Sequence, residues 1–228
     1  MTADRTGTGP RIALISAVTA AMDPAAQALR AAFDTVDLWH LLDDRLLADA
    51  EHAGGVTPPL RERMNRLIAH AECEGADAVL LTCSLYGTVA DSYRGAITVL
   101  APDQAAFSEI ARAGYRRVLI VASLPQALSD SQQRLLATLD AAGSASSIDG
   151  IVVDGAAEAA AAGDTVLLAQ RISEAVRIHH SHGDAADALF LAQYSLAPAR
   201  DMLVRDLAMP VLSGPSCSAG ELRRRLRP

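Results

Sequence analysis

The sequence has few cysteines, few aromatic residues and no long apolar run. Three of its 228 residues are cysteines, and aromatic residues make up 4%. No stretch approaches the roughly 18 apolar residues of a transmembrane helix. The opening MTADRTGTGPR lacks the apolar h-region of a signal peptide. An odd cysteine count without metal-site spacing favours a reduced, cytoplasmic protein, with no membrane partner.

Positive charge is also scarce. The formal net charge of −7 argues against nucleic acid as a partner, because phosphate binding needs a basic face. The one basic run, at 223–227, closes the last expected helix, where arginines complement the helix dipole. Partners are therefore expected among small molecules.

Motifs for common cofactors are missing. Neither G-x-x-x-x-G-K-[ST] nor G-x-G-x-x-G occurs, so phosphate and dinucleotide cofactors are not expected. No serine sits in G-x-S-x-G, which weakens a hydrolase interpretation. The cluster HHSH at 179–182 has no carboxylate or cysteine at ligand spacing and is interpreted as the basic end of a helix. We expect no cofactor and no metal.

Short apolar runs alternate with helical segments along the whole chain, which predicts an α/β fold with parallel sheets. Expected strands are 11–16, 36–42, the run ending at Cys83, 96–102, 117–123, 148–154, 188–193 and 210–214. Expected helices are 24–32, 57–75, 103–114, 129–142 and 164–183, besides the last one. Continuous apolar strands are typical of sheets covered on both faces.

The second half of the chain repeats the first. AADALFLAQYSLA at 185–197 matches GADAVLLTCSLYG at 75–87, and the order β-α-β-α-β occurs twice. We expect two similar Rossmann-like α/β halves related by a pseudo-two-fold, with a cleft between them. The first half is 1–102, completed by the C-terminal 208–228, and the second is 103–207.

Four polar side chains end strands of this scheme: Ser16, Cys83, Ser123 and Gln193. Ligands of open parallel sheets bind beyond the carboxyl ends of the strands. If the halves face each other, these four strand ends meet in the cleft. Gln193 occupies the place in the second half that Cys83 occupies in the first.

Cys83 is the candidate catalytic residue. A helix expected to start near Gly87 would lower the pKa of the thiol by favouring the thiolate. The backbone N–H groups of Ser84 and Leu85, with the Ser84 hydroxyl, could hold a carboxylate. Such a site suits proton removal alpha to a carboxylate. A buried, inert cysteine is the equal alternative, since free cysteine is among the most buried residue types.

The chain resembles the aspartate/glutamate racemase superfamily, which includes hydantoin racemases, maleate isomerases and arylmalonate decarboxylases. The resemblance rests on the strand followed by TCS at 82–84, on the duplicated halves, and on SEIARAGYRRVLIVAS at 108–123. It implies a cofactor-independent enzyme acting on a small amino acid or dicarboxylate-like acid. Racemases of the superfamily use two cysteines, one at each equivalent strand end. Cys83 matches the first, and the second position holds Gln193.

This departure leaves three functions open. Glutamine neither accepts nor donates a proton near neutral pH, although it can hydrogen-bond a carboxylate. One thiol could still serve an isomerase of this superfamily, or a decarboxylase of a malonate-like acid. The superfamily's decarboxylases also have a single cysteine, but at the second position. The third possibility is a non-catalytic protein that keeps the cleft for ligand binding.

The resemblance also implies a set of substrate-binding residues, and places a small carboxylate in the cleft of a protein that could form homo-oligomers. Ser16 and Thr19 are expected near the substrate, with helix capping as the alternative for both, and Ser123 on its carboxylate. The full set is Ser16, Thr19, Thr82, Ser84, Leu85, Ser123, Gln193 and Tyr194.

Three further residues, a tyrosine and two cysteines, are considered for positions in or near the cleft. Tyr86, like Tyr194, is either a packing residue or a hydroxyl donor in the cleft. Cys217 is a candidate for the cleft edge. Cys73 is expected to pack inside a helix.

Overall fold

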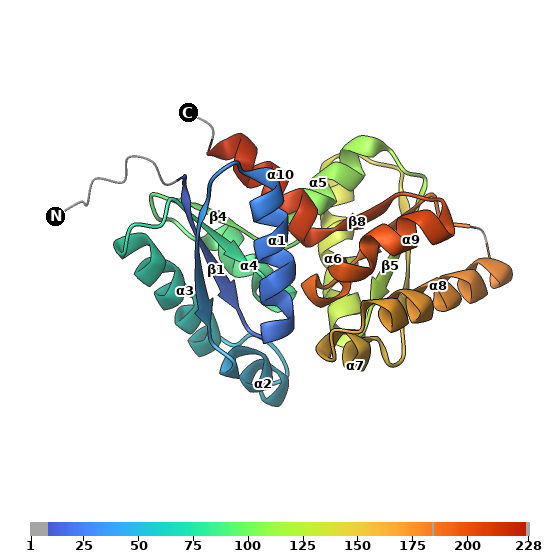
Figure 1. Ribbon diagram of the computed structural model, residues 1–228, viewed down its shortest axis with the longest axis horizontal. Coiled ribbons are helices and arrows are strands. Elements are labelled where there is room, and N and C mark those ends of the chain that lie inside the picture. Colours follow the sequence, from blue (N-terminus) through green and yellow to red (C-terminus); the bar gives the residue numbers. More distant parts are fainter. Residues whose placement is uncertain (1–8, 184, 227–228) are drawn as a thin grey trace.

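The computed structural model describes residues 9–183 and 185–226, and it contains two four-stranded parallel sheets (Figure 1). The first has the order β2-β1-β3-β4 and the second has the order β6-β5-β7-β8. The strands are β1 (Arg11–Ser16), β2 (Asp37–Leu42), β3 (Ala78–Leu81), β4 (Thr98–Leu100), β5 (Arg117–Ala122), β6 (Ser147–Val152), β7 (Ala188–Leu191) and β8 (Val211–Ser213). The expected α/β fold with two similar halves is confirmed.

The halves match in register as well as in order. Ile12 pairs with Ala78 between β1 and β3, and Val118 pairs with Ala188 between β5 and β7. The two central strands of each sheet are almost wholly buried, as continuous apolar runs covered on both faces require. The outer strands β2 and β6 are only partly buried. The long apolar runs therefore determined which strands lie inside.

Helices cover the sheets. They are α1 (Met22–Ala32), α2 (Arg45–His52), α3 (Pro58–Cys73), α4 (Gly87–Ser92), α5 (Gln104–Ala113), α6 (Pro125–Ala141), α7 (Ala156–Ala161), α8 (Thr165–His182), α9 (Arg200–Leu207) and α10 (Gly214–Arg225). Short 3-10 turns are η1 (Thr19–Ala21), η2 (Ser84–Tyr86) and η3 (Tyr194–Ala199). α6 begins earlier than expected because Pro125, with its fixed φ, suits the first helical turn. Helices α2, α7 and α9 were not anticipated.

The end of the chain is shared between the halves. The expected return of the last strand to the first half is wrong, because β8 pairs with β7 and completes the second sheet. Helix α10 does return: Figure 1 shows it beside α1, and its Leu222 is buried in one cluster with Leu29 of α1. β8 is the fourth strand of the second sheet, as β4 is of the first. Its pairing supplies hydrogen-bond partners to the backbone groups of β7.

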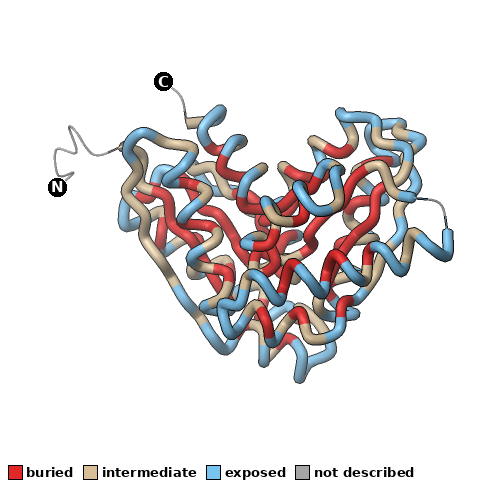
Figure 2. Tube along the Cα trace, turned by 45° about the vertical axis from the view of Figure 1, so that its right-hand side comes forward, coloured by how far each residue is buried: buried red, intermediate tan, exposed pale blue. Residues whose placement is uncertain are grey.

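Buried residues form clusters on the faces of both sheets. Figure 2 shows the buried trace concentrated in the strands, with exposed segments on the outer turns and helices. In the described residues, no helix is long and apolar enough to cross a membrane.

Candidate active site

The carboxyl ends of β3 and β7 open onto one cavity of about 100 Å³. Cys83 follows the last residue of β3 by two positions, and Gln193 follows the last residue of β7 by two. Both residues line the cavity, and each precedes a 3-10 turn, η2 or η3. The sequence repeat and the rule for parallel sheets thus correctly brought Cys83 and Gln193 together.

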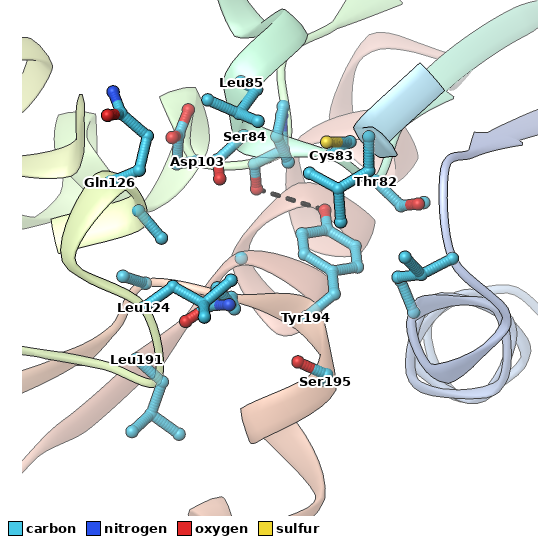
Figure 3. A pocket seen from close by; sticks show the side chains of 18 of the residues that line it. Thr82, Cys83, Ser84, Leu85, Asp103, Leu124, Gln126, Leu191, Tyr194 and Ser195 are labelled. Atoms are coloured by element: carbon cyan, nitrogen blue, oxygen red, sulfur yellow. Dashed lines mark hydrogen bonds between the residues drawn. The ribbon is translucent and has the colours of Figure 1, made fainter. Parts of the chain in front are cut away.

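Most of the cavity wall is apolar (Figure 3). Its larger apolar side chains are Val18, Leu47, Leu85, Leu124, Phe190 and Leu191. Among the described residues that line it, Glu51 and Asp103 are the only charged ones, and both are acids. The cavity therefore offers hydrocarbon surface to a ligand and no cationic side chain.

The Cys83 thiol is mainly in its protonated form at neutral pH. The backbone N–H groups of Leu85 and Tyr86, at the start of η2, donate hydrogen bonds to it and favour the thiolate. Burial outweighs them and raises the pKa of Cys83 to about 11, and the negative charges of Asp130 and Asp103 add to the rise. The expectation of a lowered pKa is thus wrong. The helix start is present, but the surrounding protein withdraws the sulfur from water.

Gln193 is held in one orientation. Its Oε1 accepts hydrogen bonds from the backbone N–H of Ser123 at 2.7 Å and from the Ser123 hydroxyl at 3.1 Å. A backbone N–H is only a donor, so these bonds identify the oxygen of the amide. The remaining polar group of Gln193 is Nε2, a donor suited to a carboxylate oxygen. Ser123 does not line the cavity itself; it orients the residue that does.

Four more expected binding residues line the cavity: Thr82, Ser84, Leu85 and Tyr194 (Figure 3). The Tyr194 hydroxyl donates to the Pro102 carbonyl oxygen at 3.1 Å and lies 3.3 Å from Ser218 Oγ. Burial raises the pKa of Tyr194 above its ordinary value. Tyr194 therefore contributes its ring to the cavity wall, while its hydroxyl holds the chain at Pro102.

Asp103 is a cavity residue that sequence reasoning assigned only to the start of a helix. It is 2% exposed, and Oδ2 accepts a hydrogen bond from Arg134 Nη1 at 2.5 Å. Burial raises the pKa of Asp103 to about 6, although Arg134 acts in the opposite direction. The signal available in the sequence was an acid three residues after β4, at the edge of the sheet where Cys83 also lies.

The comparison with solved structures places this architecture among known folds. Picrophilus torridus aspartate racemase superposes with a TM-score of 0.73 at 15% identity, over 96% of this chain and 94% of that one. Allantoin racemase from Klebsiella pneumoniae gives 0.67 at 19% identity, over 96% and 87% of the two chains. The chain therefore shares its fold with these two racemases.

Unliganded arylmalonate decarboxylase has the same fold, with a TM-score of 0.58 at 20% identity over 95% of this chain and 92% of that chain. No protein-family model and no curated protein matches the sequence. At these identities the likeness concerns the fold, so the chemistry depends on this chain's own residues.

Besides Ser123, two residues that the superfamily resemblance placed near the substrate do not line the cavity. Ser16 is buried beneath the cavity, where its Oγ accepts a hydrogen bond from Thr82 Oγ1 at 2.9 Å. Thr19 is exposed on η1, and its neighbours Val18 and Ala21 line the cavity instead. Ser16 supports Thr82. Thr19 faces solvent because residues three apart share one face of a 3-10 turn, and here Val18 and Ala21 occupy the cavity face.

Tyr86 and the other cysteines lie outside the cavity. The buried Tyr86 donates its hydroxyl to the Leu46 carbonyl oxygen at 2.8 Å, which confirms the packing interpretation. Cys217 is a residue of α10 whose Sγ lies 3.4 Å from Oε2 of Glu109 on α5. Cys73, expected to pack inside a helix, is exposed at the end of α3. Among these three cysteines, therefore, only Cys83 faces the cavity.

No group of three metal-ligating side chains occurs within residues 9–183 and 185–226. His179 instead lies 3.1 Å from Asp149, between its Nε2 and Oδ2.

Proposed function

We propose that this protein is a cofactor-independent enzyme that acts at the carbon alpha to the carboxylate of a small acid, with Cys83 as an acid/base residue. The observation that carries the proposal is the shared cavity of Cys83 and Gln193, at equivalent strand ends of the two halves. The superfamily fold supports it, since aspartate and allantoin racemases have that fold. Racemisation or isomerisation is the reaction that we favour.

The cavity suits an acid with an apolar substituent. An aspartate or glutamate substrate would bring a second carboxylate toward Glu51 and Asp103, with no cationic side chain among the described lining residues to compensate it. Burying an uncompensated charge is costly. A phenyl or alkyl group, by contrast, would pack against Leu47, Leu85 and Leu124. We therefore favour a monocarboxylate with an apolar group over the dicarboxylate-like substrate that the resemblance implies. A malonate also carries a second carboxylate, but its decarboxylation removes that charge.

The substrate carboxylate would lie against neutral donors. Gln193 Nε2 and the Ser84 hydroxyl line the cavity from opposite halves. Neutral donors hold a carboxylate less strongly than a guanidinium does. Neutral donors therefore stabilise the ground-state carboxylate of the substrate less. The enediolate formed by proton loss then gains more, relative to the bound substrate, from the same hydrogen bonds.

Decarboxylation is the second candidate, and the state of the thiol favours it. A thiol with a pKa near 11 is a proton donor at neutral pH. Loss of CO2 from a malonate leaves an enediolate that needs one proton from one side, which Cys83 alone can deliver. Arylmalonate decarboxylase is also among the proteins with this fold.

The test uses two probes, enantiopure 2-phenylpropionate in D2O and phenylmalonate. Exchange of the alpha hydrogen, inversion or release of CO2 that disappears in Cys83→Ser and persists in Cys217→Ser supports the proposal. Cys217→Ser is the matched control because that thiol is half-buried too but lies outside the cavity. Protection of Cys83 from iodoacetamide by these acids without turnover identifies a non-catalytic ligand-binding protein instead.

A further inference from the structure

The second position of the cavity lacks a proton-transfer group, and few side chains nearby could supply one. Gln193 cannot exchange protons near neutral pH, and its Oε1 is bonded to Ser123. The titratable residues that line the cavity are Glu51, Cys83, Asp103 and Tyr194. Glu51 is exposed, and the Tyr194 hydroxyl is occupied by Pro102. Asp103 is the remaining partner for Cys83.

Asp103 has an unused hydrogen-bonding atom inside the protein. Its Oδ1 is buried and has no hydrogen-bond partner in the described residues, whereas Oδ2 is bonded to Arg134. A buried carboxylate oxygen without a donor is costly, so such an atom in a native structure calls for an explanation. The position of Asp103 on the cavity wall supplies this explanation, because a bound ligand can provide the hydrogen-bond partner that Oδ1 lacks.

Arg134 fixes the carboxylate from a neighbouring helix of the same half. It extends from α6, and its Nη1 also lies 3.5 Å from the Ser84 carbonyl oxygen in the turn after Cys83. Gly87 makes room for it, since a Cβ there would lie 2.3 Å from Nη1. One guanidinium thus holds both the Asp103 side chain and the turn that carries the thiol. Figure 3 shows Asp103 and Cys83 on either side of Ser84.

We propose that Asp103 is the second proton-transfer residue of this cavity, acting through Oδ1 on the alpha carbon that Cys83 serves from the other side. This rests on the proposed function. The Asp103 carboxylate removes the alpha hydrogen as a proton. The C–H electron pair remains on the substrate as an enediolate. The Cys83 S–H bond then breaks as the new C–H bond forms, leaving Asp103 protonated and Cys83 a thiolate. The opposite enantiomer runs the same steps in reverse from that state.

The electrostatic surroundings suit these roles. Asp103 faces Arg134 of α6 and feels the negative charge of Asp91 on α4. With its pKa near 6, Asp103 is ionised at pH 7.5 but is a stronger base than an ordinary aspartate. Cys83, with its raised pKa, starts as the thiol. The resting cavity therefore contains one base and one acid.

The test follows both enantiomers of 2-phenylpropionate in D2O, with Asp103→Asn and, as control, Asp140→Asn, which removes an exposed carboxylate outside the cavity wall. We expect Asp103→Asn to slow racemisation at least ~100-fold, the usual lower range for a general acid or base. Asp140→Asn should stay within about twofold of wild type. Residual exchange in Asp103→Asn should be limited to the enantiomer whose alpha hydrogen faces Cys83, and in Cys83→Ser to the opposite one. A merely structural role would slow both enantiomers equally.

Each other outcome has a definite meaning. Equal racemisation of both enantiomers by Asp103→Asn and Asp140→Asn overturns the role of Asp103 and leaves the proposed function standing. The role of Asp103 is also overturned if wild type exchanges the alpha hydrogen without inversion, or if its only activity is the decarboxylation of phenylmalonate. If wild type neither turns over the acids nor is protected by them from alkylation, the proposed function fails and this inference fails with it. Should Asp103→Asn not fold, Asp103→Asn/Arg134→Gln, which also removes the unpaired guanidinium, carries the test.

Discussion

Ser123 donates two hydrogen bonds to one oxygen of Gln193, from its backbone N–H at 2.7 Å and from its hydroxyl at 3.1 Å. The two residues follow β5 and β7, neighbouring strands of the second sheet. Because both bonds engage Oε1 of Gln193, its Nε2 group is the polar group that remains for a ligand. At the position equivalent to the thiol, the molecule thus presents a fixed neutral donor.

This relationship predicts an order of stabilities. Gln193→Ala leaves the Ser123 N–H and hydroxyl without their acceptor and should lower the free energy of unfolding by about 1–3 kcal/mol. Ser123→Ala removes only the hydroxyl bond and keeps the backbone one, so we expect a loss of about 0.5–1.5 kcal/mol. Urea denaturation of both variants measures the difference. A larger loss for Ser123→Ala would show that the backbone bond contributes little.

The raised pKa of Cys83 predicts slow alkylation at neutral pH. The thiolate is the reactive species, so with a pKa near 11 its fraction at pH 7 is of order 10² lower than that of a free thiol. The rate should rise about tenfold per pH unit from pH 7 to pH 10. Mass spectrometry after timed iodoacetamide treatment measures it, with exposed Cys73 as the internal reference. Alkylation of Cys83 as fast as Cys73 at pH 7 would contradict the raised pKa.

Sequence reasoning reached the architecture and the pair Cys83 and Gln193, because both depend on local patterns. Continuous apolar runs predicted the inner strands, and the repeat fixed which strand ends correspond. It failed where the answer depends on distant residues. The pKa of Cys83 depends on how deeply other segments bury the sulfur. The orientation of the Asp103 carboxylate depends on Arg134, 31 positions along the chain and on another helix.

The last strand shows a second kind of failure. Two equivalent sheets each offered an edge to the segment at 210–214, and nothing in its sequence distinguishes them. Its backbone pairing with β7 decided the matter. A short strand of three residues has too few side chains to carry a preference of its own.

The Asp103–Arg134 pair predicts a pH-dependent penalty. Arg134→Met leaves a buried carboxylate without its cation and should cost about 3–5 kcal/mol at pH 8, where Asp103 is ionised. The pKa of Asp103 is raised to about 6, above its unfolded value, so the cost of ionising it accumulates as pH rises between these two values. Loss of Arg134 raises the folded pKa further, because Arg134 acts to lower it, and extends this window to higher pH. The penalty should shrink at pH 5. The double variant Arg134→Met/Asp103→Leu should regain most of the loss at pH 8. Urea unfolding at the two pH values tests both statements, and a penalty independent of pH would sink them.

Gly87 predicts the sharpest contrast between two similar changes. Gly87→Ala puts a Cβ 2.3 Å from Arg134 Nη1, and the guanidinium cannot simply swing aside because it holds Asp103 and packs 5.6 Å over the Phe107 ring. We expect a loss of about 1–3 kcal/mol from this overpacking. Gly220→Ala in α10 meets nothing within 4 Å and should instead stabilise by about 0.5–1 kcal/mol through helix propensity.

Thermal unfolding compares the two glycine variants directly, and the rate of Cys83 alkylation adds a local readout. Displacing Arg134 releases both the Asp103 carboxylate and the turn at Ser84, so Gly87→Ala should change the alkylation rate of Cys83. Gly220→Ala should leave that rate unchanged, since Gly220 does not line the cavity of Cys83 and a Cβ there meets nothing within 4 Å. Equal stabilities and equal alkylation rates for the two variants would mean that Arg134 is free to move, and that Asp103 is not held in the geometry that its proposed role requires.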